Sequence, residues 1–148
     1  MAKTDYTRNF ITGSPTQYTP GTDVTWSGYD KTLWTCPASD LNKFRLEAGD
    51  KVSFSVYIYK PTEPCYGSLN FIDNNDKTVF VSGTTVATSG SNYSTSTFTL
   101  TAEQLSNLKR VTLSVKNSKG TTCTAGIHTY KVNAGELSDW TPAPEDIL

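Results

Sequence analysis

Few charged residues and no long apolar run are the first features of this 148-residue sequence. Charged side chains make up 18% of it, against about 25% in an average soluble domain. The formal net charge is −1, with acids and bases mixed along the chain. Because no basic block is present to neutralise phosphates, we expect no nucleic-acid partner. No apolar run approaches the ~18 residues of a transmembrane helix, so we expect no membrane partner either.

Common enzyme signatures are also missing, since the chain has no G-x-S-x-G, no H-E-x-x-H and no phosphate loop. The single histidine, His128, has four residues between it and Cys123. A Cys–His dyad stays open there, although neither residue has a local signature. A glycosidase needs two carboxylates about 5–10 Å apart across a cleft, whereas the acids here fall mostly in predicted turns. We therefore expect no catalytic residues and no enzyme.

Cysteine is scarce and odd in number, with Cys36, Cys65 and Cys123 widely spaced. One disulfide with a spare thiol stays open, but the start MAKTDYTRNF lacks the apolar centre of a signal peptide, which favours free, buried thiols. With His128 the cysteines could form a four-ligand zinc set, but no C-x-x-C pair supports it. Asp73–Asp76 lacks the residue order of a calcium loop and indicates a hairpin turn. We expect no metal and no cofactor.

The clearest pattern in the chain is the alternation in residues 51–60, KVSFSVYIYK. A period of two over ten residues predicts a β-strand with one buried face. The apolar residues all fall on that face: Val52, Phe54, Val56 and Ile58. Between the lysines at its two ends, the other face carries only hydroxyl groups, from Ser53, Ser55, Tyr57 and Tyr59.

Similar short segments recur between turn residues along the whole chain, and Lys109–Asn117 is a second clean strand. A helix is predicted only over Ala102–Asn107, where Thr101 and Gln104 have the spacing of a capping box. Pro37–Asn42 is polar and predicts a loop. We count eight or nine strands, which is typical of an all-β protein.

The predicted fold is a single-domain β-sandwich, most economically a jelly roll. It covers residues 1–148, with residues 1–7 as a flexible lead and residues 136–148 as an extended C-terminal segment.

The hydroxyl and tyrosine face of the 51–60 strand predicts a sugar-binding site. Aromatic faces stack on a pyranose ring, and short polar side chains pair with hydroxyl groups that would otherwise lose their hydrogen bonds. If the neighbouring strands share a sheet, one outer face would carry Tyr57, Tyr59, Tyr66, Asn70, Arg110, Ser114 and Lys116. The alternative site is a loop rim that would present Trp26, Tyr29 and Trp34 on one connection and Tyr93 on another, although the phase of Trp26 favours the core. Tyrosines that merely cover a neighbouring strand or loop are equally compatible with the pattern.

The end of the chain, Gly135–Leu148, reads GELSDWTPAPEDIL. It resembles the closing segment of carbohydrate-binding-module-like domains in tail and baseplate proteins of phages infecting Gram-positive bacteria. Those domains end with a strand, a glycine and a phrase close to DWTPAPED, matched here by Tyr130–Gly135 and Asp139–Asp146. The start RNFITG looks like the family's first strand, which usually reads Asn-Leu-Leu before a small polar turn. The strand at 51–59 resembles the family's YTFSVYV strand.

The resemblance implies a jelly roll akin to carbohydrate-binding modules and a role in host adhesion. Cell-wall polysaccharide or teichoic acid would be the ligand, and other virion subunits would be partners. It implies a location in the virion tail, after synthesis in the host cytoplasm without a signal peptide. The family often has Glu two residues before the last-strand glycine, where this chain has Asn133, so an ion supported by that acid is not expected here.

Two alternative functions stay open on the sequence alone. The first is a structural module of the tail or head, whose outer tyrosines pack against neighbouring subunits without binding a glycan. The second is a polysaccharide-binding domain of a secreted bacterial glycoside hydrolase.

Overall fold

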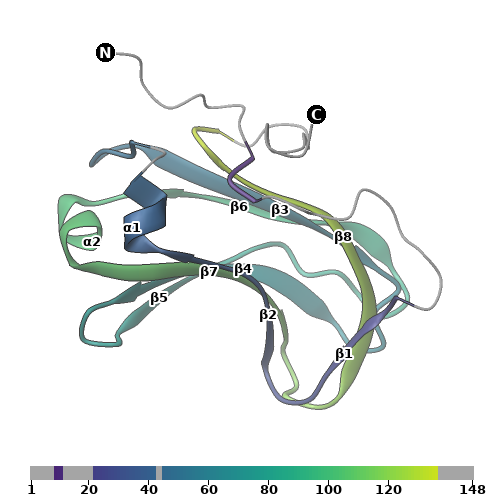
Figure 1. Ribbon diagram of the computed structural model, residues 1–148. Helices are drawn as coiled ribbons and strands as arrows, with labels where there is room; N and C mark the ends of the chain where they lie inside the picture. The colour runs from purple at the N-terminus through teal and green to yellow at the C-terminus, as the bar shows by residue number, and fades with distance from the viewer. Residues whose placement is uncertain (1–8, 12–21, 43–44, 137–148) are drawn as a thin grey trace.

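The alternating residues 51–59 form β3 (Lys51–Tyr59), a central strand of a four-stranded sheet. The computed structural model describes residues 9–11, 22–42 and 45–136. These residues form two sheets packed face to face (Figure 1). The other strands are β1 (Val24–Trp26), β2 (Asp30–Pro37), β4 (Cys65–Asp73), β5 (Thr78–Ser82), β6 (Ser91–Thr99), β7 (Leu108–Asn117) and β8 (Cys123–Ala134).

Strand order identifies the architecture. One sheet has the order β1-β8-β3-β6 and the other β2-β7-β4-β5, and every pairing is antiparallel. Neighbours in each sheet are thus distant in sequence, apart from the β4–β5 hairpin. Eight strands in two sheets with this connectivity make a jelly roll, and the predicted fold class is confirmed.

The core lies between the two sheets and follows the predicted phase. On β3, Val52, Phe54, Val56 and Ile58 are at most 2% exposed. The facing strands contribute a matching apolar set, namely Leu69, Phe71, Val111, Leu113 and Val115. Because β-branched and aromatic side chains suit a pleated surface, the inner faces interlock along their length.

A buried hydroxyl group ties the two layers together. Ser94 on β6 is fully buried, and its Oγ accepts a hydrogen bond from the Gly67 N–H of β4 (2.8 Å). The same hydroxyl donates to the Thr84 carbonyl (2.6 Å) on the connection after β5. A Cβ atom at Gly67 would lie 3.0 Å from the Phe54 ring, so the close packing of the layers leaves little room for a side chain there.

Residues 9–11 lie beside β8 and are held by the side chain of Asn9. Its Oδ1 accepts from the backbone N–H groups of Ile11 (3.0 Å) and Val132 (3.2 Å), and its Nδ2 donates to the Tyr130 carbonyl (3.2 Å). The Phe10 N–H also donates to the Val132 carbonyl. Residues 9–11 are not part of a strand, so the first strand predicted over residues 8–13 is not seen in them, and its residues 8, 12 and 13 lie outside the described part.

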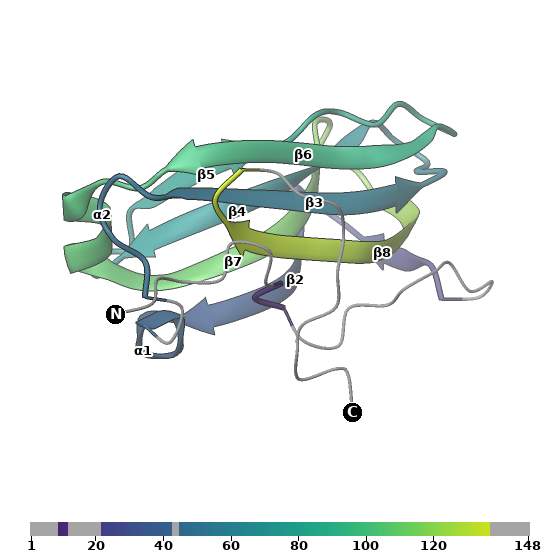
Figure 2. The same ribbon diagram turned by 90° about the horizontal axis from the view of Figure 1, so that it is seen from above.

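Two short helices lie at the same end of the sandwich (Figure 1 and Figure 2). α2 (Ala102–Asn107) confirms the predicted helix, with the Thr101–Gln104 capping box in place. α1 (Ala38–Leu41) corrects the predicted loop at Pro37–Asn42. It has no side-chain cap, and burial of Leu41 (6% exposed) against the core holds the turn.

The three cysteines are free and buried, in agreement with the favoured sequence interpretation. Residues 1–7 and 137–148, for which a flexible lead and an extended segment are predicted, lie outside the described residues. Neither helix of the described part is long or apolar enough to cross a membrane.

Candidate functional site

The predicted sugar-binding residues do not share one face, because their strands belong to different sheets. Tyr57 and Tyr59 lie on β3 of sheet β1-β8-β3-β6, and Tyr66, Asn70 and Arg110 lie on β4 and β7 of sheet β2-β7-β4-β5. Each group faces outward, so the two groups are on opposite sides of the sandwich. The single-face site is therefore wrong, and two separate candidate surfaces replace it.

The predicted loop rim is also not formed. Trp34 lies within β2, where it pairs with the inward-facing Leu113 and packs against the core. Tyr93 lies within β6, in the other sheet. Trp26 is 5% exposed at the end of β1, as its phase predicts, and Tyr29 is 66% exposed just before β2. No common rim joins these residues.

The first candidate surface is an aromatic row across β6, β3 and β8. Tyr57 pairs with Tyr93 on one side and His128 on the other. The Tyr57 ring stands edge-on to Tyr93 (centroids 4.9 Å apart, planes at 82°) and stacks on the His128 ring (4.7 Å, 28°). His128 covers one face of Tyr57, so the surface of this row that remains open is mainly that of Tyr93, which is 40% exposed.

A bulge in β8 brings His128 into this row. Between the pairs Ser55–Lys131 and Tyr57–His128, β8 has one residue more than β3, and Thr129 takes a left-handed conformation (φ 53°). The bulge reverses the phase of β8 and turns His128 outward. Burial lowers the pKa of His128 below its ordinary value of 6.5, which favours the neutral imidazole stacked on Tyr57.

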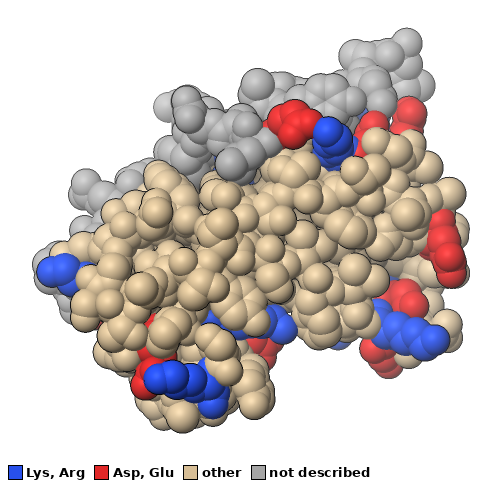
Figure 3. Space-filling model, turned by 180° about the vertical axis from the view of Figure 1, so that it is seen from behind, with Lys and Arg blue, Asp and Glu red and all other residues tan. Residues whose placement is uncertain are grey.

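The second candidate surface is a groove of about 310 Å³ on the outer face of sheet β2-β7-β4-β5. Its lining combines one aromatic ring with hydroxyl, amide and charged side chains: Asp30, Thr32, Thr35, Asn70, Ile72, Thr78, Phe80, Arg110 and Thr112. Seen from behind in Figure 3, the molecule is notched along its lower side, where this sheet lies in Figure 1. The volume of the groove is at the lower end of the range for small-molecule sites.

A hydrogen-bond network fixes the floor of the groove. Asn70 is 4% exposed and donates from Nδ2 to Thr112 Oγ1 (3.0 Å) and Ser114 Oγ (2.9 Å), while its Oδ1 accepts from Ser68 Oγ (2.6 Å). Because Thr112 Oγ1 accepts from Asn70, its own proton is left to point toward a ligand. Asn70 therefore orients the hydroxyl groups of the floor instead of contacting a ligand with its own N–H groups.

Phe80 forms the aromatic wall of the groove. It lies on the edge strand β5 and is 58% exposed, an unusual position for a large apolar ring. The Lys116 ammonium lies 3.9 Å from the ring centroid, a cation–π contact that covers one ring face. By register, Lys116 shares its row with Tyr66, and it reaches Phe80 across the row of Ser68 and Ser114.

Arg110 provides hydrogen-bond donors at the other side of the groove floor. It follows Asn70 along the face, opposite Ile72. Within the described part of the chain, its guanidinium makes no hydrogen bond or ion pair. Its N–H groups are therefore available to hydroxyl groups of a ligand, and Asp30 at the groove edge supplies an acceptor.

Of the residues that line the groove, the sequence prediction included Asn70 and Arg110 but not Phe80, and it did not place His128 beside Tyr57. The signal for Phe80 was present, since it lies between Val79 and Val81 in the outward phase of its strand. His128 had no comparable signal. The bulge at Thr129 shifts the inward and outward alternation of β8 by one residue, and the sequence does not show where that shift occurs.

The remaining chemical options receive no support from the geometry. Cys123 faces the core at the start of β8, whereas His128 faces outward, so the two do not form a dyad. Burial and the neighbouring Cys123 raise the pKa of Cys65 to about 12, which leaves that thiol protonated and unreactive. The described residues contain no group of three side chains suited to a metal ion.

Comparison with known proteins supports the fold. No protein-family model and no curated protein matches the sequence. The CBM22-1 xylan-binding domain of Paenibacillus barcinonensis Xyn10C is similar in structure, with a TM-score of 0.51 at 11% identity over 93% of this chain and 100% of that one. The CBM22-1-CBM22-2 tandem domain of the same protein has a TM-score of 0.53 at 10% identity, over 95% of this chain and 49% of the tandem domain.

A domain of the bacteriophage CBA120 tailspike protein 4 is less similar, with a TM-score of 0.42 at 15% identity over 80% of this chain and 14% of that one. At these identities, similarity to the two Xyn10C structures shows the fold alone. The chain has the jelly-roll β-sandwich fold of carbohydrate-binding modules.

Proposed function

We propose that this protein is a non-catalytic carbohydrate-binding module whose ligand lies in the groove of sheet β2-β7-β4-β5. The observation that carries the proposal is the exposed Phe80 ring beside hydrogen-bonding groups in one groove. The carbohydrate-binding-module fold supports the same function without specifying the ligand.

The groove has the two kinds of group that a sugar chain requires. Phe80 offers one ring face for the apolar side of a pyranose, while Lys116 holds the other face in place. Arg110 and the oriented hydroxyl of Thr112 donate to ring hydroxyls, and Asp30 accepts from them. Because the groove is open to solvent, it suits an internal stretch of a glycan chain.

The experiment is a pull-down on insoluble polysaccharides and bacterial cell walls with wild-type, Phe80→Ala and Arg110→Ala proteins. Tyr93→Ala is the matched control, since Tyr93 is also an exposed aromatic residue on the outer face of an edge strand. Each groove variant should bind at least about tenfold more weakly, a loss of about 1.4 kcal/mol, without a change in melting temperature. The proposal would be refuted if the wild type binds none of the glycans, or if both groove variants bind as tightly as the wild type.

The proposed biological setting is a tail or baseplate protein of a phage that infects Gram-positive bacteria. In that setting the glycan is a host cell-surface polysaccharide, the module mediates adhesion, and the protein resides in the virion tail beside other tail subunits. The phrase at Asp139–Asp146 motivates this proposal, and it lies outside the described residues. Adsorption of the tagged protein to susceptible but not resistant bacterial strains tests the setting separately from the groove.

The aromatic row favours a second candidate, a structural virion module without glycan binding. Because His128 covers one face of Tyr57, the row is better suited to packing against a flat protein surface than to stacking on sugars. A stable subunit contact buries at least ~1,000 Å² in total. If the protein is a structural module, Tyr93→Ala should impair assembly into particles and Phe80→Ala should not. The wild type should then bind no polysaccharide.

A further inference from the structure

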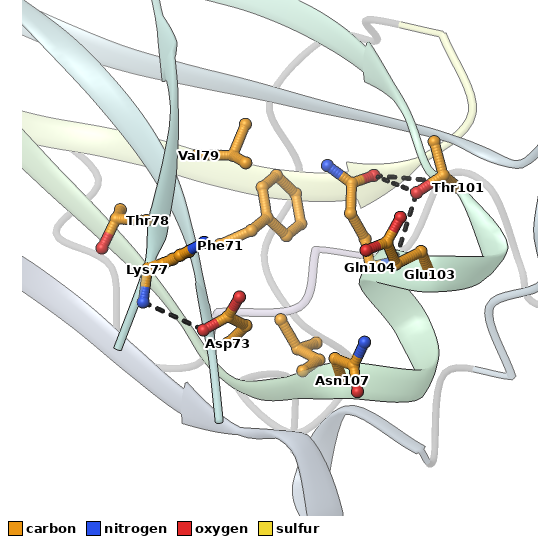
Figure 4. A pocket seen from close by; sticks show the side chains of 10 residues that line it. Phe71, Asp73, Lys77, Thr78, Val79, Thr101, Glu103, Gln104 and Asn107 are labelled. Carbon is orange, nitrogen blue, oxygen red and sulfur yellow. Dashed lines mark hydrogen bonds between the residues drawn. The ribbon is translucent and has the colours of Figure 1, made fainter. Parts of the chain in front are cut away.

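A second pocket, of about 400 Å³, lies between helix α2 and the β4–β5 hairpin (Figure 4). It is on the opposite side of β5 from the groove, because Phe80 faces the groove and Val79 faces the pocket. Thr78 is the residue that lines both spaces. The pocket is therefore a separate space that shares one lining residue with the groove.

Apolar side chains form the floor of this pocket. Phe71 is 4% exposed and packs on Phe98, with ring centroids 5.3 Å apart. Leu108 is buried beside it, while Val79 is 43% exposed at the wall. The pocket thus offers a small apolar surface at its floor.

Polar groups with spare hydrogen-bonding capacity surround that floor. Gln104 Oε1 already accepts from the Thr101 N–H and Oγ1 groups, which turns its Nε2 away from the cap. Asp73 Oδ1 accepts from the N–H groups of Asn75 and Lys77, which leaves Oδ2 available. Figure 4 shows the Gln104 and Glu103 side chains on one side of the Phe71 ring and the Asp73 carboxylate on the other.

We propose that this pocket binds a single sugar unit that carries no negative charge. Its carboxylates would accept from ring hydroxyl groups, its Gln104 amide would donate, and its apolar floor would receive the C–H face of the ring. The lining carries two carboxylates, Asp73 and Glu103, against one ammonium group, Lys77, so its net negative charge disfavours a phosphate or an acidic sugar. A purely apolar ligand would bury these carboxylates without partners, which is strongly unfavourable.

The test is an NMR titration of the ¹⁵N-labelled protein with glucose, galactose, N-acetylglucosamine and glucosamine. A parallel arm uses oligosaccharides that end in the same sugars, which distinguishes a free monosaccharide from a chain end. We expect saturable shifts in the amides of residues 71–79 and 101–108 with at least one probe.

Glu103→Gln should weaken that binding about tenfold, the effect of losing one charged acceptor. Glu103 is exposed and the described structure records no hydrogen bond of its carboxylate, so the variant should melt like the wild type. Glu63→Gln is the control, because Glu63 lies two residues before β4, near the end of that strand remote from Asp73, and pairs with Lys119 instead of lining the pocket.

If only the oligosaccharides cause shifts, and Glu103→Gln weakens this binding, the result would support the site and identify the end of a sugar chain as its ligand. The proposal would be overturned if no probe shifts these amides, or if the shifts keep the same affinity in Glu103→Gln. Phe80→Ala should leave the pocket titration unchanged, so failure of the groove proposal and failure of the pocket proposal are distinguishable.

Discussion

Replacement of Ser94 by alanine should destabilise the protein more than any other change of one hydroxyl group on β6. The Ser94 hydroxyl is fully buried and joins the two sheets through Gly67 and Thr84. Its loss leaves the Gly67 N–H without a partner, which costs about 1–3 kcal/mol, and removes a bond to Thr84 that contributes about 1 kcal/mol. The free energy of unfolding should therefore fall by about 2–4 kcal/mol, a large part of the 5–15 kcal/mol of a typical domain.

Urea denaturation of the wild type and the variant measures this change directly, and the melting temperature should fall by roughly 5–15 °C. Ser96→Ala is the matched control, because Ser96 lies two residues further along the same face of β6 and the structure records no hydrogen bond of its hydroxyl. We expect Ser96→Ala to lower the free energy of unfolding by less than about 0.5 kcal/mol. Equal effects of the two substitutions would refute the account of how the layers are joined.

Three further predictions concern buried groups. Asn9→Ala should lower the free energy of unfolding by about 2–3 kcal/mol, because Asn9 is fully buried with hydrogen bonds to Ile11, Tyr130 and Val132; a loss no larger than that of the exposed Asn75→Ala would contradict this. Burial lowers the pKa of His128, so the unfolded chain binds a proton first as the pH falls through about 6.5. The free energy of unfolding should therefore decline below about pH 6.5, and it should decline less in His128→Gln. If its pH dependence is the same in both proteins, His128 is not the group responsible. Because burial raises the pKa of Cys65 to about 12, a thiol reagent at pH 8 should label the folded protein slowly and all 3 cysteines after unfolding; rapid labelling of Cys65 in the folded state would show that the core opens.

Local rules account for the parts of the fold that the sequence predicts well. The strand at 51–60 was predicted within one residue, because its alternation places every apolar residue on one face. The helix at Ala102–Asn107 was predicted to the residue, because Thr101 and Gln104 satisfy the free N–H groups of its first turn. These features depend on residues that are neighbours in the chain.

Long-range pairing explains what could not be predicted. Tyr57 and Asn70 each have the outward phase that was expected, but which sheet a strand joins depends on partners far away in sequence. The bulge at Thr129 and the turn at α1 likewise arise from tertiary contacts that override the local pattern. The predicted single outer face is therefore divided between two sheets, and a role of its residues in binding stays a prediction.

The central claim is that a glycan lies along the outer face of sheet β2-β7-β4-β5. The most direct test is a map of amide chemical shifts in the ¹⁵N-labelled protein, titrated with a polysaccharide fragment that the wild type retains in the pull-down. The account predicts that the shifts gather on Phe80, Asn70, Thr112 and Arg110 and disappear in Phe80→Ala. Shifts that gather instead around Tyr57, Tyr93 and His128 would place the site on the opposite face and contradict the account.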